Sequence, residues 1–232
     1  MKFLLFMLLF TLAGTLRADV FTLWPVRRGG GNAAPGSILD GSFKQVLHKE
    51  TVLVNGIRLE MEILQTEVPF DTLLAQLKRS LGKDDFRAEG STVRIGYPVS
   101  GNRVERWLLV REKGDKSTLF HMVSPQKLPP PAGWPKELPP LPVGATVTQT
   151  MEFPKRGGIQ GTFQNAQGHK RDILRQMGRY LESDGWIAAG AEATLTHTSG
   201  GDLFIRTRKG KELLWIAIGD DGSGSCYYRK SK

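Results

Sequence analysis

The stretch 171-RDILRQMGRYLESDGW-186 is the clearest structural signal in the chain. With successive residues placed 100° apart, its apolar side chains fall on one arc: Ile173, Leu174, Met177, Tyr180 and Leu181. Three arginines, four residues apart, fall on the opposite side. Gly185 stands where helices commonly stop in a left-handed conformation, and Trp186 can fold back on the last turn. The stretch therefore predicts an amphipathic helix that ends near Asp184.

A related pattern occurs 100 residues earlier, between Leu73 and Phe86. Both stretches have Leu, Gln, Arg, Leu and Asp at equivalent positions: Leu74, Gln76, Arg79, Leu81 and Asp84, and then Leu174, Gln176, Arg179, Leu181 and Asp184. Self-similarity at a fixed spacing is typical of an internal repeat.

Strand patterns surround both helices. Alternating apolar residues flank Asn55-Gly56, which is the strongest short-range signal of a β-hairpin. The second half has a similar hairpin pattern at 145–153 and 159–164. Further strand patterns follow each helix, at 92–97, 104–111 and 117–123 in the first half and at 193–198, 203–207, 213–218 and 226–228 in the second.

These elements predict an α+β fold of two tandem repeats, 42–127 and 145–232. Each repeat is a small antiparallel sheet with one packed helix, in the order β-β-α-β-β-β. Seven of the 13 prolines fall in the segment 128–144 between them. Such a run is extended and stiff, which predicts a Pro-rich linker, with a ligand strip for a partner's aromatic groove as the alternative. One helix covers one face of a sheet, so the other face needs the sister repeat, a second protomer or a partner.

The first residues predict export. Residues 1–18 combine an early lysine, a short apolar run and a small residue, the parts of a signal peptide, with cleavage expected after Ala18. Another cleavage site or a retained anchor is the alternative, although the apolar run is shorter than the roughly 18 to 20 residues that span a bilayer. Residues 19–41 read as a flexible lead segment rich in glycine. A single cysteine, Cys226, rules out an internal disulfide and favours a bacterial periplasmic or secreted protein.

The formal net charge of +9 favours contact with acidic surfaces. The best candidate basic surface lies in the second repeat, where a solvated face is favoured and a contact surface for a polyanion or a partner is the alternative. Its residues are Arg171, Arg175, Arg179, Arg206, Arg208 and Lys209.

No catalytic, cofactor or metal site is predicted. The four histidines form no His-Glu-x-x-His motif, and Cys226 has no second thiol near it. Ser223 lies between glycines, but no helix pattern follows it, so a hairpin turn is favoured over a hydrolase elbow. His121, inside an apolar strand pattern, is expected on an edge strand or packed inward.

Three functions remain open. The first is a non-enzymatic protein that binds another envelope protein, for assembly, secretion or an accessory role, through an exposed sheet edge or face. The second is a polyanion-binding module for lipopolysaccharide, anionic lipid or nucleic acid. The third is an enzyme with dispersed groups, in which His169 or His197 meets a carboxylate. No transmembrane span is expected in the mature chain, and a homo-oligomer is left open.

Overall fold

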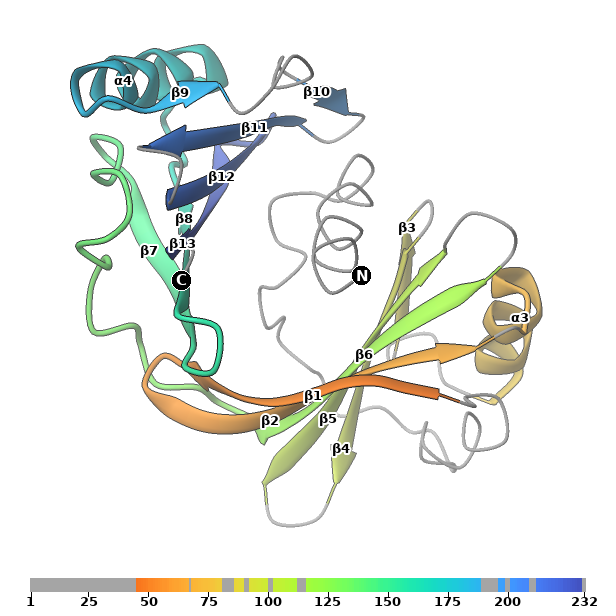
Figure 1. The fold of residues 1–232 in the computed structure, drawn as a ribbon. Helices are drawn as coiled ribbons and strands as arrows, with labels where there is room; N and C mark the ends of the chain where they lie inside the picture. The colour runs from red at the N-terminus through yellow and green to blue at the C-terminus, as the bar shows by residue number, and fades with distance from the viewer. Residues whose placement is uncertain are drawn as a thin grey trace. The chain divides into compact units, whose positions relative to one another are not determined.

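The structure is a computed structural model, and it describes residues 45–66, 68–80, 86–89, 92–99, 102–111, 116–188, 196–198, 201–208 and 212–230. The signal peptide and the lead segment expected from the sequence lie outside these ranges. Two helices are described, α3 (Phe70–Ser80) and α4 (Lys170–Ser183) (Figure 1). The strands are β1 (Gln45–Val54), β2 (Ile57–Thr66), β3 (Phe86–Glu89), β4 (Thr92–Val99), β5 (Arg103–Arg111), β6 (Ser117–Pro125), β7 (Thr146–Phe153), β8 (Gly158–Gln164), β9 (Ile187–Ala188), β10 (Thr196–Thr198), β11 (Gly201–Arg208), β12 (Glu212–Gly219) and β13 (Ser223–Lys230).

The described strands belong to one antiparallel sheet of 13 strands, so the prediction of two tandem repeats with separate small sheets is wrong. Neighbouring strands follow the order β10-β11-β12-β13-β8-β7-β1-β2-β6-β5-β4-β3, and β9 pairs with β11. The pairing that joins the strands is between β1 and β7, where Leu53 faces Glu152 and Val54 faces Met151. The fold is one large sheet that carries two helices.

The turn between β1 and β2 explains this join. Asn55 and Gly56 have positive φ angles of 49° and 80°, as a two-residue hairpin turn requires. The Asn55 backbone N–H donates to the Thr150 carbonyl at 2.9 Å, and its Oδ1 accepts the Thr150 N–H at 2.8 Å. Its Nδ2 donates to the Pro129 carbonyl at 2.8 Å. The sequence shows the turn, but not these partners from a distant part of the chain.

The chain divides into two compact units. The C-terminal unit includes Leu53–Ile57, the tip of the first hairpin, together with Pro129–Lys232. The N-terminal unit includes the described residues of Leu23–Val52 and Arg58–Leu128.

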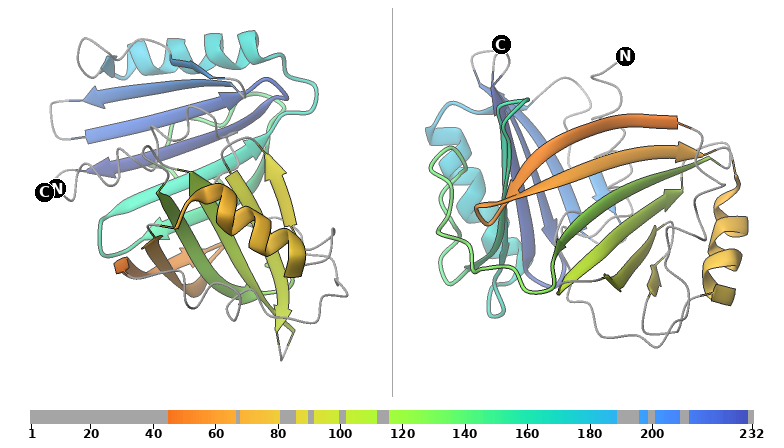
Figure 2. Two further views of the ribbon diagram at one scale, coloured as in Figure 1. Left: turned by 90° about the vertical axis from the view of Figure 1, so that its right-hand side faces the viewer. Right: turned by 90° about the horizontal axis from the view of Figure 1, so that it is seen from below.

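In the N-terminal unit, α3 packs on one face of the sheet (Figure 2). The helix contributes Phe70, Leu73 and Leu77, which are spaced three and four apart and are all buried. They pack with buried side chains of the strands: Val93, Ile95, Trp107, Leu109 and Leu119. These apolar residues stabilise the unit because their surface is removed from water on folding.

The C-terminal helix forms where the sequence predicts it. Gly185 has a φ of +75°, and its N–H donates to the Glu182 carbonyl at 3.3 Å. The Trp186 N–H donates to the Leu181 carbonyl at 2.9 Å. This pair of bonds is a Schellman motif, which satisfies carbonyls that the helix end leaves free. The predicted stop near Asp184 is confirmed.

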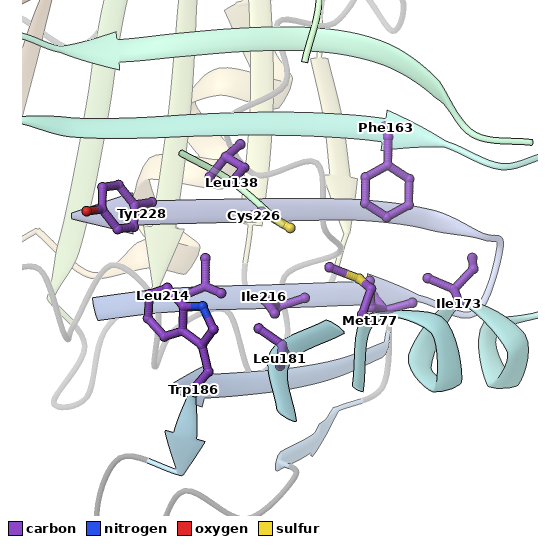
Figure 3. Close-up of a cluster of buried hydrophobic side chains, with 11 residues drawn as sticks. Leu138, Phe163, Ile173, Met177, Leu181, Trp186, Leu214, Ile216, Cys226 and Tyr228 are labelled. Carbon is purple, nitrogen blue, oxygen red and sulfur yellow. The ribbon is translucent and has the colours of Figure 1, made fainter. Parts of the chain in front are cut away.

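The inner side of α4 joins a core with the sheet of its own unit (Figure 3). Ile173, Met177 and Leu181 of the helix are all buried. Their partners are Leu138, Phe163, Trp186, Leu214, Ile216, Ile218, Cys226 and Tyr228.

The Pro-rich segment, predicted to be an extended linker, packs on this core through two of its side chains. Leu138 is buried, and Trp134 packs beside it with its Nε1 donating to the Pro139 carbonyl at 2.6 Å. Trp134 lies over Gly161 of β8, where an added Cβ would be 2.5 Å from the indole ring. The prolines favour an extended backbone, and burial of the two apolar side chains stabilises its docking.

Candidate functional site

A lysine, two glutamates and a histidine form a line across neighbouring strands of the N-terminal unit, and we call them the charge row. They are Lys49 on β1, Glu62 on β2, His121 on β6 and Glu105 on β5. Lys49 Nζ lies 2.6 Å from Glu62 Oε1, and Glu62 Oε2 lies 3.5 Å from His121 Nδ1. His121 Nε2 lies 3.2 Å from Glu105 Oε1. When His121 is protonated, the signs along the row alternate.

The sheet register positions His121 within this row. It lies opposite Glu62 of β2 on one side and opposite Trp107 of β5 on the other. Its ring centroid is 4.4 Å from that of Trp107, with a tilt of 36°. Because β6 lies between β2 and β5, His121 is on an interior strand, and its ring nitrogens face carboxylates rather than a purely apolar core.

The charges of the row perturb one another. The hydrogen bond with His121 lowers the pKa of Glu105, although burial opposes this effect. The hydrogen bond from Lys49 is the main cause that lowers the pKa of Glu62, and His121 adds to it. The same bond to Glu62 raises the pKa of Lys49. Each carboxylate is therefore stabilised in its charged form.

These shifts predict an acid-sensitive N-terminal unit. A carboxyl group with a lowered pKa in the folded state stabilises the fold above the ordinary value of 4.5, and this contribution is lost as the pH falls through the folded value. We expect His121→Gln to lower the free energy of unfolding by about 1 kcal/mol at pH 5 and by much less at pH 3. Urea unfolding at both pH values measures this. An equal loss at pH 5 and pH 3 would contradict the ionic role of His121.

Beside the charge row, β1 has an open edge. Its pairing with β7 covers Leu53 and Val54, and no other described strand flanks it on that side. The N–H of Asn55 points toward β7, and N–H directions alternate along a strand. Those of Leu47, Lys49 and Thr51 therefore point away from β2. Within the described part of the chain, no strand pairs with the outward backbone groups of Leu47, Lys49 and Thr51.

The basic residues expected to form one surface are only partly brought together. Arg171, Arg175 and Arg179 are exposed on the outer side of α4, and Arg175 lies 3.6 Å from Asp172. Arg206 on β11 is half-buried. Lys209 lies outside the described residues.

Arg208 belongs to a separate cluster within the C-terminal unit. Its guanidinium forms an ion pair with Asp184, donates from Nε to Glu212 Oε2 at 2.6 Å and lies 4.7 Å from the Trp186 ring centroid. Trp186 Nε1 donates to Asp184 Oδ2 at 3.1 Å, and the Tyr228 hydroxyl donates to Glu212 Oε1 at 2.8 Å. Arg208 thus joins the end of α4 to the sheet, and it is not a free cation on a polyanion surface.

Comparisons with known proteins identify no family for this chain. No protein-family model matches the chain, and no curated protein matches its sequence. Among solved structures, the acyl-CoA thioesterase II TesB2 from Mycobacterium marinum aligns with 12% sequence identity and a TM-score of 0.17, over 73% of this chain and 91% of that chain. A likeness this low supports no conclusion about fold or activity.

The described ranges offer little support for a membrane span, a metal site or a reactive thiol. They contain no helix long and apolar enough to cross a membrane, and no group of three or more His, Cys, Asp or Glu residues arranged to hold a metal ion. Cys226 is buried, and burial raises the pKa of its thiol. His169 is exposed at the start of α4. The side chain of His197 is not among those described.

The charge row was not predicted from the sequence, although the hairpin pattern contains part of it. Lys49 and Glu62 are equally distant from the Asn55-Gly56 turn, so the hairpin register alone sets them opposite each other. His121 and Glu105 come from strands whose place beside β2 depends on the order of the whole sheet. That order has no local signal in the sequence.

Proposed function

We propose that this chain is an exported, non-enzymatic protein of the bacterial envelope that binds another envelope protein. Binding occurs when an extended segment of the partner adds to the sheet beside β1. The observation that carries the proposal is that no described strand pairs with the outer side of β1 at Leu47, Lys49 and Thr51. Strand addition to such an edge supplies main-chain hydrogen bonds, and the flanking side chains supply specificity. The signal-peptide pattern of residues 1–18 supports export.

The test removes one outward N–H from the edge. Lys49→Pro deletes the backbone donor at an edge position, where proline is tolerated because no ladder bond to β2 is lost. Lys49→Thr also loses the ion pair with Glu62 but keeps the N–H. We expect the amount of envelope partner captured in pull-downs to fall by about tenfold or more for the proline variant. For the threonine variant, the fall should be smaller than about fivefold.

Two readouts complete this experiment. In the wild-type complex, the amide protons of Leu47, Lys49 and Thr51 should exchange more slowly than in the free protein. Circular dichroism should show that both variants fold, and Leu47→Pro provides a second edge variant if Lys49→Pro does not. Equal capture by folded Lys49→Pro and Lys49→Thr would refute binding at this edge.

A second candidate function rests on the outer side of α4. Arg171, Arg175 and Arg179 are spaced four residues apart and exposed, so they can contact successive negative charges of a polyanion such as lipopolysaccharide. Arg208 is not part of this surface because it is paired with Asp184 and Glu212.

Charge reversal tests the second candidate. We expect Arg175→Glu with Arg179→Glu to weaken binding to heparin or lipopolysaccharide by more than about tenfold, and to reduce its dependence on salt. The matched control reverses Lys136 and Lys155, two exposed cations of the same unit that lie off α4. Equal losses in the two double variants would mean that net charge, and not this face, determines the affinity.

A further inference from the structure

We infer that the segment bound at the β1 edge carries an aspartate or glutamate opposite Lys49, with an apolar side chain opposite Leu47 and a hydrogen-bonding side chain opposite Thr51. This inference rests on the proposed function and names the chemistry of the partner. The inference is based on the charge row. Its last residue, Lys49, lies on β1 at a position where no described strand pairs with the outer side.

The charge row ends at Lys49, and no described strand continues it. His121 has a carboxylate within 3.5 Å of each ring nitrogen, from Glu62 and Glu105. Lys49 has Glu62 on its inner side, and its own side chain is 58% exposed. No described strand lies on its outer side. Opposite charges on adjacent strands stabilise a sheet, and like charges destabilise it, so a carboxylate continues the alternation.

The register follows from the sheet. Side chains alternate between the two faces of a strand, so Leu47 and Thr51 share the face of Lys49. Thr51 Oγ1 already donates to Glu60 Oε1 at 2.7 Å, which shows that this position holds polar partners. The strand pairings described in this sheet are antiparallel. The bound segment therefore reads, from its N-terminus, as a hydrogen-bonding residue, an acid and an apolar residue at alternate positions.

A second copy of the chain fits this edge poorly. Antiparallel pairings centred on residues 45–52 set Lys49 opposite Lys49 or Leu47 of the other copy. Neither position supplies an anion. A lysine on an edge strand is also a common feature that prevents pairing between identical edges. The charge of the edge therefore selects an acidic segment of a different protein.

A charge swap provides the test, with a synthetic probe. The peptide has Thr, Glu and Val at alternate positions, separated by threonines that favour strands, and a matched peptide has Lys in place of Glu. Fluorescence anisotropy measures the affinity of both peptides for the mature wild-type protein and for Lys49→Glu. We expect the wild type to bind the Glu peptide about fivefold more tightly than the Lys peptide, and Lys49→Glu to show the reverse preference. Salt should weaken both preferences, because the charges are partly exposed.

The outcomes separate this inference from the proposed function. If both proteins bind the two peptides equally and Lys49→Pro abolishes binding, the acid opposite Lys49 is refuted and strand addition stands. If Lys49→Pro binds the peptides as well as the wild type does, strand addition at this edge is refuted as well. If neither peptide binds at about 1 mM, the three facing residues do not specify the ligand, and the inference is refuted. In that case the pull-down with Lys49→Pro still tests the proposed function.

Discussion

Gly224→Ala is expected to lower the free energy of unfolding of the C-terminal unit by about 3 kcal/mol. Gly224 of β13 pairs with Phe163 of β8, and the Phe163 ring packs against it. An added Cβ would overlap this ring. Phe163 is 1% exposed and meets Trp134 edge-on at 5.8 Å, so the ring cannot move without disturbing its neighbours. Urea unfolding followed by tryptophan fluorescence measures the effect.

Gly178→Ala is the matched control. Gly178 lies on α4, and apart from the neighbouring backbone of its own helix no atom lies within 4 Å of the position that its Cβ would take. Alanine favours a helix over glycine by roughly 0.5–1 kcal/mol, so this variant should be more stable than the wild type. The same chemical change thus has opposite signs at the two sites. A Gly224→Ala protein as stable as the wild type would contradict the packing of Phe163 on β13.

Arg208→Ala is expected to cost about 2 kcal/mol of unfolding free energy, a value reduced because Arg208 and Asp184 are partly exposed. The substitution leaves the carboxylates of Asp184 and Glu212 without their shared cation, and it removes the stacking on Trp186. Thermal and urea unfolding measure the loss. Arg208→Lys should recover less than half of it, because an ammonium group cannot reproduce the planar contacts with both acids and the ring.

Arg171→Ala provides the control for this prediction. Arg171 carries the same charge on the exposed side of α4, so its loss should change the stability by no more than about 0.5 kcal/mol. If both alanine variants have the same stability, the Arg208 cluster does not stabilise the end of α4.

The sequence was informative wherever neighbours along the chain determine the structure. The extent of α4 and its stop at Gly185 follow from a 3.6-residue period and a positive φ at one glycine. The hairpin at Asn55-Gly56 follows from a turn type that few dipeptides adopt. Two strands were missed. The four-residue β3 and the two-residue β9 are too short to show a periodic pattern.

Tertiary contacts decided which partners the basic and proline-rich segments have. The spacing of Arg171, Arg175 and Arg179 predicted their shared exposed face, but the capture of Arg208 by Asp184 required β11 to lie beside the end of α4. Likewise, a proline-rich composition indicates an extended backbone but not the docking of Trp134 over Gly161.

The sequence by itself therefore determined the C-terminal helix, the first hairpin and the basic charge, and export stays a prediction. Only the tertiary structure decided that the described strands form one sheet and that β1 meets β7 at its tip, with no other described strand on that side. It also decided that Lys49, Glu62, His121 and Glu105 meet in one row. The physical reason is that periodicity and turn chemistry act between residues a few positions apart. Strand order depends on hydrogen bonds and packing between segments far apart in the sequence, such as Asn55 with Thr150.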